Sequence, residues 1–122
     1  MSGVLILDDR EDNLLSMQAI LAREPYPVAI ESDPNNLFSQ ITAHEPEVLV
    51  LDLRLPGGTS GIDLARLIRQ TIPSTVMRIL AVTAAPEMYT DRMAIEAGCD
   101  SYFSKPFGIR DFRDEVNRLL DL

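Results

Sequence analysis

The chain has 122 residues, of which 46% are hydrophobic and 25% charged, a composition typical of one folded domain spanning residues 1–122 rather than of a disordered segment. Nineteen acidic residues against eleven basic ones give a net charge of −8, which disfavours direct binding to nucleic acid and to anionic membranes. The single cysteine excludes an internal disulfide, and the N-terminus lacks the pattern of a signal peptide, so we expect a cytoplasmic protein.

Short apolar runs alternate with segments of helical periodicity along the whole chain. Continuous apolarity is typical of strands that are buried on both faces of a sheet. In chain order the expected elements are strand Val4–Leu7, helix Asn13–Ala22, strand Val28–Glu31, helix Pro34–Ala43, strand Val48–Leu51, helix Gly61–Ile72, strand Ile79–Val82, helix Glu87–Ala97, strand Ser101–Phe103 and helix Ile109–Leu120. This alternation predicts an α/β fold, a three-layer sandwich in which five helices cover a central five-stranded parallel sheet.

Polar residues follow the expected strands at the points where the strands end. Asp8 and Asp9 follow the first strand, Asp52 the third and Thr83 the fourth, while Lys105 comes just after the last. Because the carboxyl ends of parallel strands meet at one edge of the sheet, we expect these side chains to lie together. Three carboxylates repel one another unless a cation lies among them, and an oxygen-only ligand set suits Mg²⁺ or Mn²⁺ rather than zinc. A carboxylate beside a cation, an ammonium and a hydroxyl is equipped to accept a phosphoryl group.

These segments, taken in this order, resemble the receiver domain of two-component response regulators over essentially the whole chain. The motifs that carry the resemblance are Val4–Asp9, Leu51–Gly57, Ala81–Ala84 and Tyr102–Phe107. The resemblance implies the flavodoxin-like strand order 2-1-3-4-5. It also implies a phosphoacceptor protein that is not an enzyme, although it takes part in its own phosphorylation and dephosphorylation.

The resemblance assigns four residues to phosphorylation and metal binding. Asp52 matches the phosphoacceptor, and Asp9 matches the carboxylate that binds Mg²⁺ directly. Asp8 matches its partner, which usually acts through water, and the backbone carbonyl of Arg54 would be a further ligand. Mn²⁺ would be a substitute for Mg²⁺ at the same oxygens.

The resemblance also assigns the groups that hold the phosphoryl group and transmit its presence. Thr83 and Lys105 match the hydroxyl and the ammonium that contact the phosphoryl oxygens. Tyr102 matches the aromatic residue whose rotamer follows the threonine, so Thr83 and Tyr102 would form the switch. The Lys105–Pro106 peptide bond matches a position that is usually cis in receivers.

Two features depart from the family pattern. Gly61 lies nine positions after Asp52, where the matching glycine of many receivers lies eight positions after, so the loop at Gly57–Ser60 holds one extra residue. Arg54 stands at a variable position, from which its long cationic side chain would lean over the phosphoryl group.

The partners implied by the resemblance are a sensor histidine kinase or a histidine phosphotransfer protein as donor, and a downstream protein or a fused output domain as target. A homodimer through the face of the fourth helix, fifth strand and fifth helix is a further expectation. The sequence leaves open whether the chain is a stand-alone regulator or a receiver excised from a larger regulator or hybrid kinase.

Other interpretations of the same residues remain. A small Mg²⁺-dependent phosphatase with an aspartate nucleophile would carry the motif D-x-D, with a second aspartate two residues after the nucleophile. In this chain Arg54 stands two residues after Asp52. A flavodoxin-like electron carrier would need a Ser/Thr-rich phosphate loop after the first strand, and a degenerate receiver would act only as a scaffold. Asp8 and Asp9 would serve simply as helix caps in a protein without a metal site, and Tyr102 as an edge aromatic.

Overall fold

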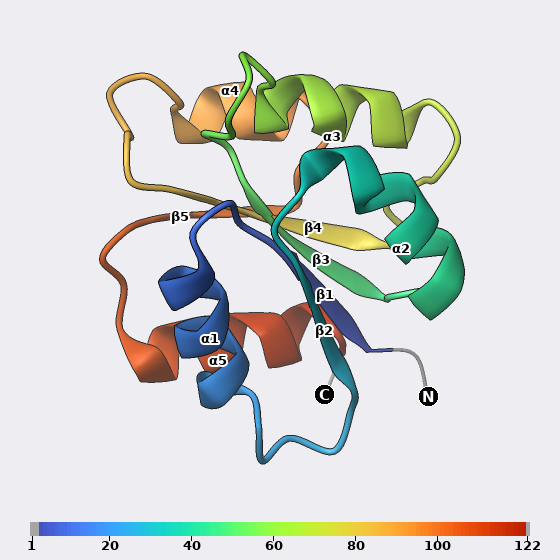
Figure 1. Cartoon of the computed structure of the whole chain (residues 1–122), viewed down its shortest axis with the longest axis vertical. Coiled ribbons are helices and arrows are strands. Elements are labelled where there is room, and N and C mark those ends of the chain that lie inside the picture. The colour runs from blue at the N-terminus through green and yellow to red at the C-terminus, as the bar shows by residue number, and fades with distance from the viewer. Residues whose placement is uncertain (1–2, 122) are drawn as a thin grey trace.

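The structure, a computed structural model, describes residues 3–121 as a central parallel sheet covered by helices on both faces (Figure 1). In chain order its elements are β1 (Val4–Leu7), α1 (Glu11–Ile20), β2 (Val28–Glu31), η1 (Pro34–Asn36), α2 (Leu37–His44), β3 (Val48–Asp52), α3 (Gly61–Arg69), β4 (Arg78–Thr83), α4 (Asp91–Glu96), β5 (Ser101–Ser104) and α5 (Ile109–Leu119). The strands are ordered β2-β1-β3-β4-β5, so the predicted α/β sandwich and its strand order are confirmed.

The central strands carry apolar runs because both of their faces are covered, and their polar residues Arg78, Asp52 and Thr83 stand at the strand ends. In β1, Leu5 and Leu7 belong to a core cluster shared with α2, α3 and α4, while Val4 and Ile6 belong to a second cluster shared with α1 and α5. Figure 1 shows the same division, with α2, α3 and α4 on one face of the sheet and α1 and α5 on the other. Successive side chains of a strand point to opposite faces, which explains the uninterrupted apolar runs of the sequence.

The largest departure from the predicted elements is the start of α4. A helix was expected from Glu87, but α4 begins at Asp91, because residues 86–88 form a separate turn in which Met88 N and Tyr89 N donate to Ala85 O. The Thr90 side chain then caps the helix by accepting from Met93 N at 3.2 Å. A good cap therefore outweighs the helical periodicity that precedes it.

Smaller shifts occur at the other helices. The helix expected at Pro34–Ala43 begins with the 3-10 turn η1, where the Asp33 side chain accepts from Asn35 N at 2.9 Å. The helix expected at Asn13–Ala22 lies at Glu11–Ile20, and the one expected to reach Ile72 ends at Arg69.

The register of the sheet aligns the strand ends that carry polar residues. Leu7 of β1 pairs with Leu51 of β3, so Asp8 and Asp52 follow neighbouring paired residues. In β4, Thr83 pairs with Ser104, the residue before Lys105. The sheet therefore places the predicted polar residues at one edge.

Candidate functional site

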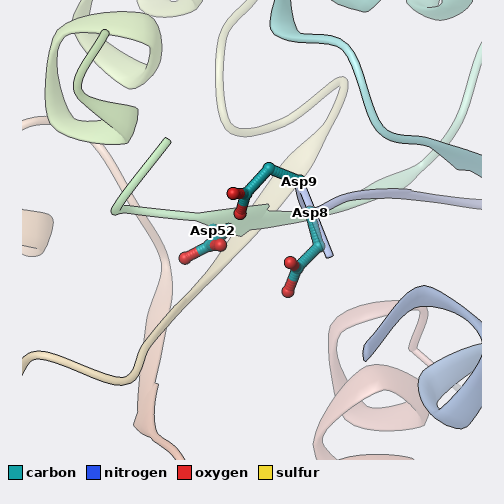
Figure 2. A group of neighbouring side chains, drawn as sticks. All are labelled: Asp8, Asp9 and Asp52. Carbon is teal, nitrogen blue, oxygen red and sulfur yellow. The ribbon is translucent and has the colours of Figure 1, made fainter. Parts of the chain in front are cut away.

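Three carboxyl groups meet where β1 and β3 end. Oxygens of Asp8, Asp9 and Asp52 all lie within 4.8 Å of one another, and Figure 2 shows the two side chains that follow β1 beside the one from the end of β3. Asp8 is fully buried and Asp52 is 5% exposed, while Asp9 is exposed. The cluster thus has two buried carboxyls and one that reaches solvent.

Asp52 is held by the chain that follows it. The backbone N–H of Arg54 donates to Asp52 Oδ1 at 3.2 Å. Helix α3 begins against this segment, with Gly61 N donating to Leu53 O at 2.9 Å. A Cβ on Gly61 would lie 2.4 Å from the Asp52 carbonyl oxygen, so only glycine allows the helix to start so close to the carboxylate.

Asp8 uses both of its oxygens in hydrogen bonds. Its Oδ1 accepts from Arg10 N at 2.9 Å and from Asn13 Nδ2 at 3.5 Å, and its Oδ2 accepts from Lys105 Nζ at 2.6 Å. The capping interpretation does not describe this pair of aspartates, since the N-cap residue of α1 is Arg10 and no side chain caps it. The buried Asp8 carboxylate instead forms an ion pair with the lysine.

Lys105 and Thr83 complete the polar side of the site. Lys105 Nζ lies 3.9 Å from Asp52 Oδ2, farther than from Asp8, and its side chain is 15% exposed. Its backbone N–H donates to Thr83 O at 2.7 Å, and the Lys105–Pro106 peptide bond is cis. Thr83 is fully buried, and its Oγ1 accepts from Ala85 N at 3.0 Å.

The electrostatics of the site disfavour the ionised form of Asp52. Burial is the main cause that raises the pKa of Asp52 to about 7, and the negative charges of Asp8 and Asp9 act in the same direction. The positive charge of Lys105 and the N–H of Arg54 lower this pKa but do not cancel the burial. A bound cation would offset the same repulsion.

Tyr102 connects the site to α4. Its hydroxyl donates to the backbone carbonyl of Tyr89 at 2.6 Å, and its half-buried ring packs against the core cluster under α4. The bond joins β5 to the segment between Thr83 and α4. Burial raises the pKa of the Tyr102 hydroxyl further above neutrality, and the protonated hydroxyl is the donor in this bond.

One cavity adjoins the carboxylates and a second lies next to it. The first, of about 330 Å³, is lined by Asp9, Arg10, Asn13, Asp52, Arg54, Leu55, Pro56, Ala84 and Lys105. The second, of about 1050 Å³, lies along α1 and the start of α5 and is lined in part by four of the same residues, namely Arg10, Asn13, Ala84 and Lys105. The carboxylate cavity and the larger groove are therefore neighbours that share these four lining residues.

Sequence reasoning missed three contributors to this site. Asn13 lines both cavities and contacts Asp8, but its position in an expected helix marks it only as a helix residue. The carbonyl of Tyr89 is a backbone acceptor and has no sequence signature. Arg10 also lines both cavities. Its position directly after the two aspartates at the end of β1 is a sequence signal that could have marked it as a site residue.

Comparison with known proteins agrees with this geometry. A family model of the response regulator receiver domain matches residues 4–117. The alkaline phosphatase synthesis transcriptional regulatory protein PhoP of Bacillus subtilis is 31% identical over 117 residues, which cover 96% of this chain and 48% of that protein. The response regulator ArlR of Staphylococcus epidermidis is 29% identical over 98% of this chain and 53% of its own length. The chain spans about half the length of these curated relatives.

Solved structures of receivers superpose on nearly the whole chain. The CheY-like response regulator receiver domain protein of Methanospirillum hungatei is 26% identical with a TM-score of 0.87, covering 99% of this chain and 94% of that one. The BeF3-activated DrrB receiver domain is 24% identical with a TM-score of 0.86, covering 100% and 99%. Within residues 3–121, no helix has the length and apolarity needed to cross a membrane.

Proposed function

Because the chain belongs to the family of response regulator receiver domains, we propose that its Asp52 accepts a phosphoryl group from a phosphohistidine of a partner protein. The observation that carries this proposal is the meeting of Asp8, Asp9, Asp52 and Lys105 at one edge of the sheet. Such an arrangement supplies a nucleophilic carboxylate together with oxygen ligands for a cation and an ammonium for the transferred group.

The transfer exchanges one bond to phosphorus for another. An Asp52 carboxylate oxygen forms a bond to phosphorus while the P–N bond of the phosphohistidine breaks, and the electron pair of that bond returns to the imidazole. The Arg54 N–H holds one carboxylate oxygen of Asp52 at 3.2 Å, so the nucleophile is oriented before the donor arrives. The product is an aspartyl phosphate on this chain, and we expect no turnover of free phosphoesters.

The carboxylate cluster fits Mg²⁺, with Mn²⁺ as a substitute. Asp8, Asp9 and Asp52 offer oxygens within 4.8 Å of one another, and the carbonyl of Arg54 would be a further ligand. When bound, the cation neutralises charge on the phosphoryl oxygens and favours the ionised, nucleophilic form of Asp52. Asp9 is exposed, so the cluster is accessible from solvent.

Lys105 and Thr83 are proposed to hold the transferred group. The lysine ammonium lies 2.6 Å from Asp8 and 3.9 Å from Asp52, so it already faces the space between the two carboxylates. A phosphoryl oxygen on Asp52 would attract the Lys105 ammonium, which would then have this oxygen as a partner in addition to Asp8. The Thr83 Oγ1 accepts from Ala85 N, and its own O–H would donate a hydrogen bond to a phosphoryl oxygen.

The same contacts suggest how phosphorylation reaches the surface. Thr83 begins the segment that leads to Tyr89, whose carbonyl receives the Tyr102 hydroxyl. A shift of Thr83 toward a phosphoryl group would move this segment and favour a different surface around α4, β5 and α5. That surface is proposed to contact a downstream protein, a fused output domain or a second copy of the chain.

The donor is proposed to approach along the larger groove. This groove shares lining residues with the carboxylate cavity and carries four cationic side chains, Arg10, Arg23, Lys105 and Arg113, beside the one acidic residue Glu24. Its apolar lining includes Met17, Ile20 and Phe107. An amphipathic helix that presents a phosphohistidine has the matching chemistry, and a histidine kinase or histidine phosphotransfer protein would supply it.

Radiolabelled phosphoramidate tests the chemistry without a partner, because it contains the same P–N bond. We expect Mg²⁺-dependent labelling of the protein, loss of labelling in Asp52→Asn and normal labelling in the control Asp63→Asn, whose carboxylate is 74% exposed on α3. Equal labelling of the Asp52→Asn variant would overturn the proposal.

A further inference from the structure

The most heavily bonded side chain outside the phosphorylation site is Arg69, the last residue of α3. It donates to Gly98 O at 2.8 Å, Met77 O at 2.7 Å, Ile72 O at 3.1 Å and the Asp100 carboxylate at 2.8 Å. Its side chain is only 13% exposed. The four acceptors lie in three segments: the turn that follows α3, the residue before β4 and the turn between α4 and β5.

The turn between α4 and β5 is shaped to receive this arginine. Gly98 has a φ of +104°, and a Cβ there would meet Arg69 Cγ at 2.5 Å, so the guanidinium stem passes directly over the glycine. Asp100, two residues on, accepts from Ile79 N at 2.8 Å and from the Ser74 hydroxyl, while its own N–H donates to Ile79 O at 2.8 Å. The turn is thus bonded to β4 through main chain and side chain together.

The two ends of α4 are held very differently. At the C-terminal end, Arg69 and Asp100 join the turn to α3 and β4. Among the described residues 3–121, the hydrogen bonds of the segment 84–90 at the N-terminal end are made within that segment or to the residues directly before and after it. The exception is Tyr89 O, which accepts from the Tyr102 hydroxyl of β5. Figure 1 shows α3 and α4 side by side on the same face of the sheet.

From this asymmetry we infer that Arg69 fixes the C-terminal end of α4, so that phosphorylation moves the N-terminal end of the helix about a pivot at Gly98–Asp100. The movement of α4 on phosphorylation rests on the proposed function, whereas the anchoring of its C-terminal end by Arg69 does not. Because α4 has six residues and is only about 9 Å long, a shift of the segment at Tyr89 becomes a tilt of this short helix about the pivot rather than a translation.

Hydrogen exchange of the resting protein tests the anchoring. The reporter amides are Cys99 N and Asp100 N at the pivot, and Met88 N and Met93 N at the other end, all of which donate hydrogen bonds. We expect Arg69→Lys, which keeps the charge but loses the planar fork, to reduce protection at the pivot amides by about tenfold, equivalent to about 1.4 kcal/mol of local opening.

The matched control for this substitution is Arg66→Lys on the same helix. Arg66 is 58% exposed and pairs with Asp63 at the surface, so its replacement should leave exchange at the pivot unchanged. Asp100→Asn, which removes the charge but keeps an acceptor, should act in the same direction as Arg69→Lys. Unchanged protection at the pivot in both Arg69→Lys and Asp100→Asn would overturn the anchoring role.

Addition of Mg²⁺ and beryllofluoride, a mimic of the phosphoryl group, tests the pivot itself. We expect amide shifts at residues 84–93 and little change at residues 97–100 in the parent chain, and a spread of the shifts into residues 97–100 in Arg69→Lys. Equal shifts at both ends of α4 in the parent chain would refute the pivot. Absence of any shift at Asp52 and Thr83 would contradict the proposed function and its use of the pivot, while the exchange comparison still decides the anchoring.

Discussion

Replacing Asp52 by asparagine is expected to stabilise the protein in the absence of divalent metal. Burial raises the pKa of Asp52 from an ordinary 3.8 to about 7, so the folded state disfavours the ionised carboxylate. A pKa difference of one unit corresponds to about 1.4 kcal/mol, which gives a cost of the order of 2–4 kcal/mol above pH 7 when part of the repulsion is relieved by relaxation. Asparagine keeps the oxygen that accepts from Arg54 N and carries no charge.

The sign of the pH dependence follows from the direction of this shift. Below the ordinary pKa of 3.8, Asp52 is protonated in both the folded and the unfolded state, and the parent chain has its full stability. As the pH rises toward about 7, the unfolded chain loses the proton while the folded chain keeps it, so the free energy of unfolding falls. The asparagine variant lacks this contribution, so its advantage should appear above pH 4 and level off above pH 7.

Urea unfolding in the presence of a chelator, across this pH range, measures the difference directly, because all other titrating groups are common to both chains. Asp63→Asn serves as the control, since that carboxylate is exposed at the surface. An excess of Mg²⁺ should shrink the difference between the parent chain and Asp52→Asn. A variant no more stable than the parent at high pH, or a difference that does not depend on pH, would refute the reasoning.

Three further substitutions probe the rest of the site. Asp9→Ala should abolish the rise in melting temperature that Mg²⁺ produces while leaving a folded protein, and an undiminished rise would contradict the metal site. Arg54→Ala should speed loss of the phosphoryl group about tenfold, or about 1.4 kcal/mol in the barrier, because the exposed arginine at the edge of the cavity is expected to shield Asp52 from water. Mass spectrometry over time would show unchanged or slower loss if Arg54 does not shield. Tyr102→Phe removes the hydroxyl that donates to Tyr89 O, so beryllofluoride should still shift amides near Asp52 but shift those of α4 less. Undiminished shifts in α4 would exclude Tyr102 from the switch.

The sequence predicted the sheet well because buried parallel strands carry a strong local signal. The expected bounds of β1 and β2 match the structure, and β3, β4 and β5 extend only one residue further at one or both ends. Helix ends were harder to place, as at α4, because a capping side chain and a preceding turn decide them rather than periodicity. Cys99 is buried within the turn that receives Arg69.

The composition of the site was predictable, but its internal pairing was not. Asp8, Asp9, Asp52, Thr83 and Lys105 follow apolar strands, and parallel topology alone brings them to one edge. The closer pairing of Lys105 with Asp8 than with Asp52 depends on three-dimensional distances of 2.6 and 3.9 Å. Bonds to backbone carbonyls, such as those that Tyr102 and Arg69 make, involve acceptors that every residue possesses and so leave no pattern in the sequence.

The most direct test of phosphorylation at Asp52 is to locate the phosphoryl group itself. The protein would be incubated with acetyl phosphate and Mg²⁺, its intact mass measured, and the acyl phosphate reduced with borohydride so that peptide mapping identifies the modified residue. We predict the added mass of one phosphoryl group, dependent on Mg²⁺ and mapped to Asp52. Addition without metal, addition at another residue or undiminished addition to the Asp52→Asn variant would contradict the account.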